Sequence, residues 1–305
     1  MILIWGSNYS VVKTALGQIP PLPFNSLRLA LASLLFLASL AVTGGTPEPA
    51  GVTGRPGWRA FPSARALSGR DWLSIAALGV IGHFIYQLCF MGGLSRTTVS
   101  NSSLILGTSP VAVAMLTSAV GHERVSRRHW IGAALSVVGI YLLAGRGASL
   151  SGQTLVGDLL AMCAVLCWAI YTVAARSLLE RHSPLVVTGY SMAIGTSLYV
   201  PFGLAGLRAL DWRSVGLGAW SGLVFSAVLA LYVAYLIWYT AVQRIGNLRT
   251  SMYSNVLPVV AMVIAAVWLN EEISGPKAAG AAAILIGVGI TRIGATLPAS
   301  TPPEE

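Results

Sequence analysis

Charged residues are absent from five long stretches of this chain, and this absence limits the solvent in which it can fold. Residues 72–95, 97–122, 182–207, 214–243 and 250–270 contain no Asp, Glu, Lys or Arg. Each stretch reaches the ~20 residues that an α-helix needs to cross the hydrocarbon of a bilayer. Helices around a water-soluble core would carry a polar face, which these segments lack. The sequence therefore predicts an all-α membrane protein.

The chain also repeats itself. One set of matches has an offset of 163 residues and pairs Trp5, Lys13, Leu16, Pro21 and Leu22 with Trp168, Arg176, Leu179, Pro184 and Leu185. A second set has an offset of 148 residues and pairs Arg96, Ser103, Pro110, Glu123, Gly132 and Gly139 with Arg244, Ser251, Pro258, Glu271, Gly280 and Gly287. One longer loop in the first copy, near residues 44–70, accounts for the change of offset. Duplicated membrane units are the usual architecture of secondary transporters.

Ten membrane spans are predicted, five in each copy. The first copy, residues 1–146, holds spans at about 1–17, 23–43, 72–94, 98–120 and 130–145. The second copy, residues 153–293, holds spans at about 156–178, 184–206, 216–240, 248–269 and 277–293. Glycines recur in the fifth and tenth spans and predict close helix packing there. Residues 294–305 are predicted to be a disordered tail.

An odd number of spans per copy means that the two copies cross the membrane in opposite senses, which predicts two inverted five-helix repeats. Basic residues favour the cytoplasmic side of short loops. With the N-terminus inside, the cytoplasmic segments hold twelve basic residues: Arg55, Arg59, Arg65, Arg70, Arg124, Arg127, Arg128, Arg176, Arg181, Arg244, Arg249 and Arg292. The outer segments hold five: Arg96, Arg146, Arg208, Arg213 and Lys277. The bias predicts that both termini lie in the cytoplasm. The expected location is the plasma membrane of a prokaryote.

Several classes of function have no support in the sequence. The net charge of +9 comes from basic residues scattered over loops, so no nucleic-acid partner is predicted. Cys89, Cys163 and Cys167 all lie inside predicted spans and form neither a disulfide framework nor a metal motif. No metal site and no cofactor is predicted. The first span is short beside its counterpart in the second copy, which predicts additional residues upstream of Met1.

A family resemblance rests on a few landmarks. The opening Ile4-Trp5-Gly6-Ser7-Asn8, followed by Lys13, Pro20-Pro21-Leu22 and Arg28, resembles the start of the EamA family in the drug/metabolite transporter superfamily. The paired prolines Pro110 and Pro258, and Glu123 and Glu271 after the fourth span of each copy, also resemble that family. The resemblance implies a transporter that exports or exchanges small metabolites, often amino acids, through a central cavity.

Two repeat-related helix faces are candidates to line that cavity. Trp5, Tyr9 and Lys13 recur at i, i+4 and i+8, so they share a helix face. Trp168 begins the matching face in the second copy, and the echoed motifs add Asn8 and Tyr171 to the candidates. Packing, or a belt at the membrane interface, is an equally good explanation of the tryptophans.

Two further faces complete the candidate site. Tyr232 and Tyr235 lie on an aromatic stripe of the eighth span, and Gln87 is the repeat counterpart of Tyr235. Tyrosine hydroxyls need partners in apolar surroundings, which favours a cavity over simple packing. Ser251 and Asn255 precede Pro258 in the ninth span, where a proline could free a backbone carbonyl. An ordinary kink explains that proline as well.

Few ionisable groups fall within the spans. Lys13 and Arg28 both lie toward the outer side, and either could attract a carboxylate or phosphate of a substrate. Lys13 could instead extend to the membrane surface. His83 could carry a proton, although a hydrogen-bonded structural role fits it better. No Asp or Glu lies in the middle of a span, so no carboxylate proton relay is evident.

The leading hypothesis is therefore a transporter, not an enzyme, that moves small metabolites or drugs by alternating access. Its partners would be a small-molecule substrate and the lipid bilayer, and a homodimer is left open. The rival hypothesis is a membrane enzyme or assembly factor that acts on lipid-linked substrates. Such a protein would need a cluster of Asp, Glu, His or Cys at one membrane interface, and the sequence contains none.

Overall fold

The computed structural model describes residues 1–43, 67–96, 102, 105–121, 126–144, 152–269, 273 and 275–292. The predicted tail 294–305, most of the predicted loop 44–70, and the landmarks Ser103, Glu123 and Glu271 lie outside these residues.

Every described secondary-structure element is a helix. The first half contains α1 (Ile2–Ala15), α2 (Pro21–Thr43), α3 (Gly69–Gly79), η1 (Val80–Ile85), α4 (Tyr86–Arg96), α6 (Ser109–Ala119) and α7 (Arg127–Ala144). The second half contains α8 (Gly152–Leu179), α9 (Pro184–Ala209), α10 (Leu217–Phe225), η3 (Ser226–Val233), α11 (Ala234–Ile245), α12 (Asn247–Ser254), α13 (Leu257–Leu269) and α14 (Gly275–Arg292).

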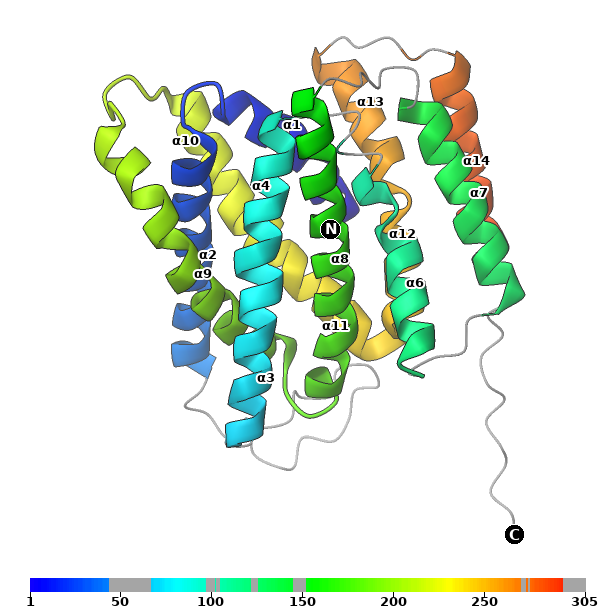
Figure 1. Ribbon diagram of the computed structural model, residues 1–305, viewed down its shortest axis with the longest axis horizontal. Coiled ribbons are helices and arrows are strands. Elements are labelled where there is room, and N and C mark those ends of the chain that lie inside the picture. Colours follow the sequence, from blue (N-terminus) through cyan, green and yellow to red (C-terminus); the bar gives the residue numbers. More distant parts are fainter. Residues whose placement is uncertain are drawn as a thin grey trace, which may run out of the picture.

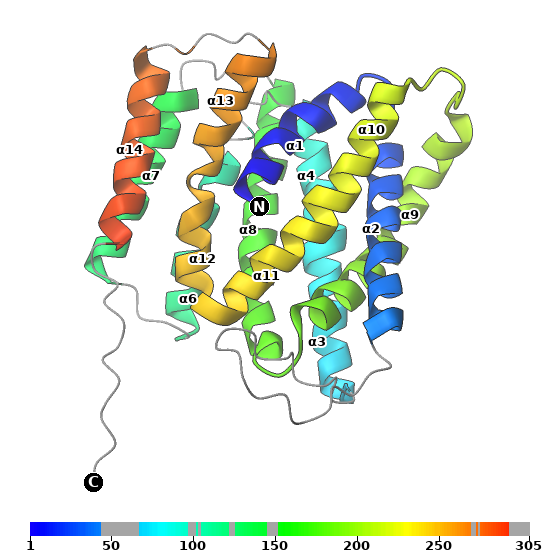
Figure 2. The ribbon, with the colours of Figure 1, turned by 180° about the vertical axis from the view of Figure 1, so that it is seen from behind.

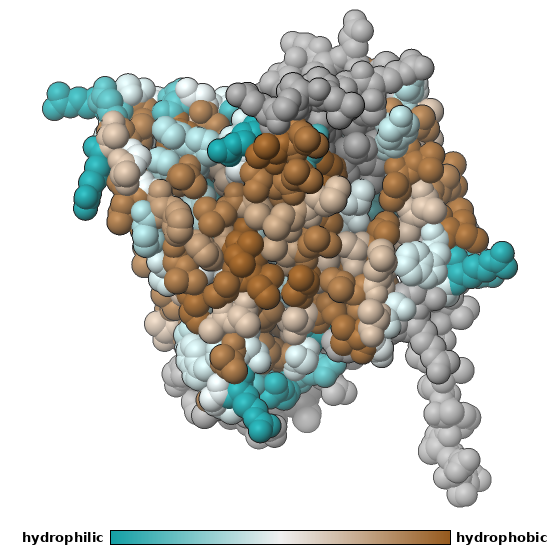
Figure 3. Space-filling model, viewed as in Figure 1, coloured by the Kyte–Doolittle hydropathy of each residue, from teal (hydrophilic) through white to brown (hydrophobic). Residues whose placement is uncertain are grey.

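Five of the described helical segments are long and apolar enough to cross a membrane: Pro21–Val42, Gly69–Arg96, Leu155–Leu179, Pro184–Ala209 and Leu217–Ile245. Three shorter apolar helices accompany them: Ile105–Ala119, Trp130–Gly139 and Ala278–Gly287. Apolar residues cover the middle of the face in Figure 3, and hydrophilic residues gather at its upper left and lower ends. Leu73 on α3 and Leu217 on α10 are 74% and 85% exposed. Such a surface suits a bilayer, so the chain is a multi-pass membrane protein.

Neighbouring helices run side by side in alternating directions. In Figure 1, α2 descends from its N-terminal end while its counterpart α9 ascends. On the opposite side of the molecule α7 ascends and α14 descends beside it. Seen from behind in Figure 2, α1 and the segment from α10 to α11 lie obliquely across the other helices.

Local sequence signals explain where two of these helices begin. Ser68 and Asp71 form a capping box, in which each side chain accepts a hydrogen bond from the other residue's backbone N–H, at 3.2 and 3.1 Å. Ser183 caps α9 by accepting from Val186 N, and Pro184 follows at the first helical position. Asp71 also pairs with Arg181 at 2.7 Å, so the start of α3 is tied to the connection between α8 and α9.

Glycines set the contact between α7 and α14. A Cβ added at Gly139 would lie 2.6 Å from the Gly280 carbonyl oxygen, and one added at Gly287 would lie 2.7 Å from the Gly132 carbonyl oxygen. The four glycines are the repeat-related pairs from which close packing was predicted. Each helix therefore presents its glycine to the backbone of the other, and the contact is reciprocal.

Both halves carry a π-helical segment in the third predicted span. The segment is Val80–Ile85 in the first half and Ser226–Val233 in the second. The sequence offset of 148 residues maps 80–85 onto 228–233, inside η3. The duplication is thus visible in a backbone irregularity as well as in the sequence. Short π-helical segments often occur at functional sites.

Candidate functional site

A cavity of about 100 Å³ lies between the two halves of the chain. Its walls come from α1, α2, α4, α8, α11 and η3, together with the segments around residues 107 and 257. The lining residues are Trp5, Asn8, Tyr9, Arg28, Tyr86, Gln87, Phe90, Leu106, Gly107, Ser109, Trp168, Ala230, Leu231, Tyr235, Ser254, Leu257 and Pro258. Because both sequence copies contribute, the site exists only when the two halves pack together.

Seven of the twelve residues selected from the sequence line this cavity: Trp5, Asn8, Tyr9, Arg28, Gln87, Trp168 and Tyr235. They come from five helices, α1, α2, α4, α8 and α11, in both halves of the chain. The helix faces that were selected from the sequence repeat therefore contribute to the same cavity.

Arg28 provides the positive charge of the cavity. Its side chain is only 2% exposed. One guanidinium nitrogen, Nη1, donates to Ser226 Oγ at 3.0 Å, and Nη2 donates to Gln87 Oε1 at 2.9 Å. The third donor, Nε, has no hydrogen-bond partner within the described parts of the chain. Both partners are neutral, so the charge is oriented without being neutralised.

Tryptophan and tyrosine rings form the apolar wall. The Trp5 and Trp168 rings meet at a centroid distance of 5.6 Å, and Trp168 lies 5.6 Å from both Tyr86 and Tyr235. Trp5 is fixed further because its Nε1 donates to the Ala230 carbonyl at 2.9 Å. That carbonyl belongs to η3, where the π-helical turn departs from regular α-helical hydrogen bonding. The wall is therefore aromatic, and a hydrogen bond orients one of its rings.

Two of the selected residues lie near the cavity but outside it. Lys13 is exposed and donates to the Leu94 carbonyl at 3.4 Å, at the C-terminal end of α4. Tyr171 is buried and bonded on both sides, to His83 Nε2 at 2.8 Å and to Ser191 Oγ at 3.0 Å. The structural role expected for His83 matches this network.

The remaining three selected residues satisfy their polar groups elsewhere. The Tyr232 hydroxyl bonds to Ser39 Oγ at 2.7 Å. Ser251 donates to a carbonyl three residues earlier in its own helix. Asn255 Nδ2 donates to Ser136 Oγ at 3.2 Å and so ties the ninth span to α7. The ninth span is broken between α12 and α13, just before Pro258, and Pro258 itself lines the cavity.

Two functional candidates were missed by sequence reasoning. Tyr86 lines the cavity one residue before Gln87 and one helical turn before Phe90. This aromatic i, i+4 pair beside a selected residue was a usable signal in the sequence. Ser226 orients Arg28 from η3. An isolated serine 198 residues from its partner gives no pattern in a single sequence.

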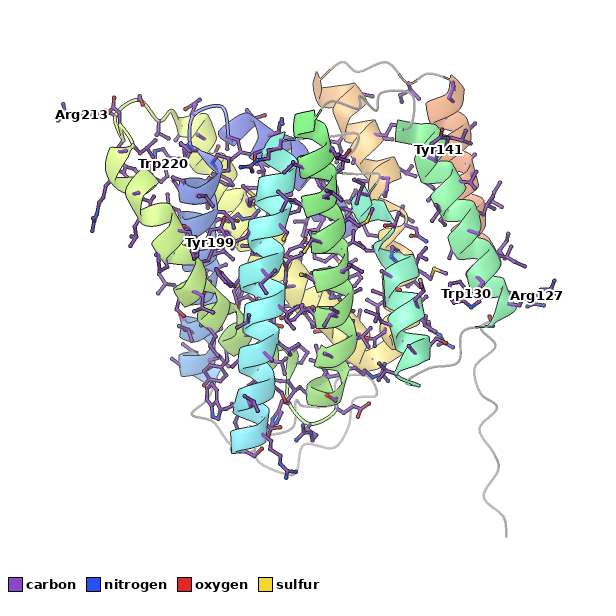
Figure 4. The ribbon with its side chains drawn as sticks, in the orientation of Figure 1. Arg127, Trp130, Tyr141, Tyr199, Arg213 and Trp220 are labelled. Carbon is purple, nitrogen blue, oxygen red and sulfur yellow. The ribbon has the colours of Figure 1, made fainter. Side chains whose placement is uncertain are left out.

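No group of three His, Cys, Asp or Glu side chains suited to a metal ion occurs in the part of the chain that the structure describes. The charged side chains labelled in Figure 4, Arg127 and Arg213, extend away from the helices on opposite sides of the molecule. Inside the bundle the cavity combines one guanidinium, several neutral hydrogen-bonding groups and aromatic rings. This arrangement can bind a small molecule.

The model of the EamA-like transporter family matches residues 1–145 and 155–293, nearly the whole chain. The chain belongs to the EamA-like transporter family. The "Uncharacterized transporter YyaM" of Bacillus subtilis is 26% identical to it, over 94% of this chain and 91% of that protein. A "Probable amino-acid metabolite efflux pump" of Salmonella typhimurium is 26% identical, over 96% and 93%.

A "Probable terminal-alkyne amino-acid exporter" of Streptantibioticus cattleyicolor, another relative of this EamA-like chain, is 25% identical over 88% of this chain and 83% of that protein. A solved crystal structure with 19% sequence identity has the same fold, with a TM-score of 0.73 over 96% of this chain and 93% of that chain. The family resemblance predicted from the sequence landmarks is therefore confirmed.

Proposed function

We propose that this protein exports or exchanges small metabolites across the prokaryotic plasma membrane by alternating access. The observation that carries the proposal is a buried, uncompensated Arg28 in a cavity between the two halves of a multi-pass bundle. In secondary transporters the substrate site lies at such an interface between repeats. The names of the relatives support export of amino acids or related compounds. They give no support to a membrane enzyme.

The proposed architecture is ten spans in two inverted repeats, residues 1–146 and 153–293. The opposite directions of α2 and α9 in Figure 1 support the inversion. The distribution of basic residues, twelve against five, supports a cytoplasmic location of both termini. In this orientation Arg28 approaches the cavity from the outer half of α2.

Alternating access requires that two similar halves adopt different conformations. Trp5 and Trp168 are equivalent in the repeat, but only the Trp5 indole N–H has a hydrogen-bond partner among the described residues. The acceptor, Ala230, corresponds to Gly82 in the first half. We infer that Trp168 donates to the Gly82 carbonyl when the transporter faces the other side. The two halves would thereby exchange roles.

The substrate carries an anionic group in this account. Arg28 is buried, hydrogen-bonded to neutral groups and directed into the cavity, and its Nε has no partner among the residues that the structure describes. Guanidinium groups bind carboxylates and phosphates through charge-assisted hydrogen bonds. A carboxylate that enters the cavity would neutralise a charge that is costly to bury. Amino acids and other small carboxylic acids are therefore the first candidates.

The proposal is tested with the full chain reconstituted in lipid vesicles that are loaded with a total bacterial metabolite extract. Mass spectrometry then identifies compounds that leave protein-containing vesicles faster than protein-free vesicles. The account predicts selective efflux of small carboxylic acids, accelerated by the same compound outside. Equal efflux of all metabolites from both kinds of vesicle would contradict it.

A further inference from the structure

The charges of the cavity point to a narrower substrate class than small metabolites in general. Arg28 is the one charged residue among the described residues that line it. On the helices that line the cavity, the acidic residue nearest in sequence to a lining residue is Asp158, ten positions before Trp168. Ten residues of α-helix span about 15 Å. Among the described lining residues, the cavity thus carries one fixed positive charge and no negative one.

This imbalance distinguishes substrates by their net charge. A substrate with one negative charge neutralises Arg28 and leaves a neutral complex. A zwitterionic amino acid brings an ammonium group close to the same guanidinium, and the buried complex keeps a net positive charge. A positively charged amine adds a second cation to the cavity. Charge repulsion is screened weakly in buried sites, so the anion is favoured.

The walls specify the body of the substrate. Tyr86 and Phe90 are stacked at a centroid distance of 5.8 Å with an interplanar angle of 14°. The neighbouring wall is formed by Trp5, Trp168 and Tyr235. Their rings meet edge to face, with centroid distances of 5.6 and 6.0 Å. Aromatic rings favour flat, polarisable partners in offset or edge contacts. A ring or another flat unsaturated group fits this wall better than a flexible polar chain.

Asn8 adds a second, independent polar feature. Its side chain is 8% exposed and lines the cavity, but its carboxamide oxygen has no hydrogen-bond partner within the described residues. A buried acceptor without a partner is costly unless a ligand or water supplies a donor. A hydroxyl or N–H group on the substrate would satisfy it. The donor need not be charged.

We propose that the cavity selects flat aromatic monoanions that carry a neutral hydrogen-bond donor, in preference to zwitterionic amino acids of the same shape. This inference rests on the proposed transport function and narrows its substrate class. Arg28 holds the anionic group, the ring lies against Trp168 and its neighbours, and Asn8 accepts from the distal donor.

The test uses ligands of similar shape and different charge. Isothermal titration calorimetry on the detergent-purified full chain at pH 7 compares 3-phenylpropionate, 3-(4-hydroxyphenyl)propionate, phenylalanine and 2-phenylethylammonium. We expect 3-phenylpropionate to bind at least tenfold more tightly than phenylalanine, and the ammonium compound not to bind. The hydroxyl should strengthen binding several-fold, and Asn8→Ala should remove that gain, so that the variant binds 3-phenylpropionate and 3-(4-hydroxyphenyl)propionate with equal affinity.

Arg28→Gln should reduce the preference for 3-phenylpropionate over phenylalanine to less than twofold. Equal or tighter binding of phenylalanine by the unsubstituted protein would overturn the inference, and so would the absence of binding by all four compounds. Vesicle efflux separates this failure from failure of the proposed function. Selective efflux of another metabolite would leave the transporter in place and reject only the substrate class.

Discussion

The indole rings of Trp5 and Trp168 meet edge to face, with centroids 5.6 Å apart and an interplanar angle of 84°. They occupy equivalent positions in the duplicated sequence, but among the described residues only the Trp5 indole has a hydrogen-bond partner, the Ala230 carbonyl at 2.9 Å. The contact joins the first helix of each half at the cavity wall. A symmetric sequence thus has an asymmetric conformation at the place where a substrate would bind.

This asymmetry predicts opposite effects of two matched substitutions. Trp5→Phe removes a hydrogen bond that exists only in the observed state. Such a bond contributes ~0.5–1.5 kcal/mol, so the population of this state should fall roughly two- to tenfold relative to the other. Trp168→Phe should instead favour the observed state. Electron-electron distance measurements between spin labels at Ser95→Cys and Leu217→Cys, with the native cysteines replaced, report the two populations. An unchanged distance distribution in Trp5→Phe would count against the exchange.

Gln87→Glu should abolish most transport of anionic substrates without disturbing the fold. The new carboxylate would lie within hydrogen-bond distance of Arg28 Nη2, where the amide oxygen now accepts at 2.9 Å. The resulting ion pair would neutralise the charge that the substrate needs. We expect vesicle transport of anionic substrates to fall at least tenfold while the melting temperature is unchanged or higher. Gln18→Glu is the control, because Gln18 is exposed and lies outside the cavity. Normal transport by Gln87→Glu would refute this role for Arg28.

The glycine contact between α7 and α14 allows a comparison of two positions on one helix. Gly287→Ala would place a Cβ 2.7 Å from the Gly132 carbonyl oxygen, whereas a Cβ at Gly289 meets no atom within 4 Å. Overpacking against backbone costs about 1–3 kcal/mol. The melting temperature in detergent should therefore fall for Gly287→Ala. It should stay equal or rise for Gly289→Ala, because alanine favours the helix. Equal melting temperatures would show that the helices separate easily.

The proposed orientation predicts which loops an impermeant maleimide can reach in intact cells. Arg213 follows α9 and Glu180 follows α8, and both side chains are exposed. In a variant whose native cysteines are replaced, Arg213→Cys should be labelled from outside. Glu180→Cys should be labelled only after the cells are opened. The reverse pattern would invert the proposed topology.

The sequence predicted most of the helical framework because a bilayer excludes charged side chains from the helices that cross it. Glycines in the fifth and tenth predicted spans also marked a close helix contact. It located seven cavity residues because a duplicated motif such as Trp5 and Trp168 marks the interface between repeats. It could not place Tyr171 and Asn255, which share periodic faces with cavity residues but form hydrogen bonds with neighbouring helices. Periodicity gives a helix face, and only helix packing decides what that face contacts.

Ser226 shows a second limit of sequence reasoning. It accepts the bond from Arg28 at the start of the π-helical segment η3, and no periodic pattern in the sequence predicts that segment. From the sequence, Lys13 could either attract an anionic substrate group or extend to the membrane surface. The structure places Lys13 at the surface of α1, where its ammonium group contacts the Leu94 carbonyl.

The most direct test of the central claim is substrate counterflow in reconstituted vesicles with Arg28→Gln, Arg28→Lys and Arg96→Gln at equal protein amounts. A charge-assisted hydrogen bond contributes ~1.5–3 kcal/mol, so Arg28→Gln should slow exchange of the anionic substrate at least tenfold. Arg28→Lys should recover part of the rate, because lysine retains the charge without the planar fork. Arg96 is exposed and bonds within its own helix, so its substitution should have no effect. Exchange at the unsubstituted rate by Arg28→Gln would contradict the account.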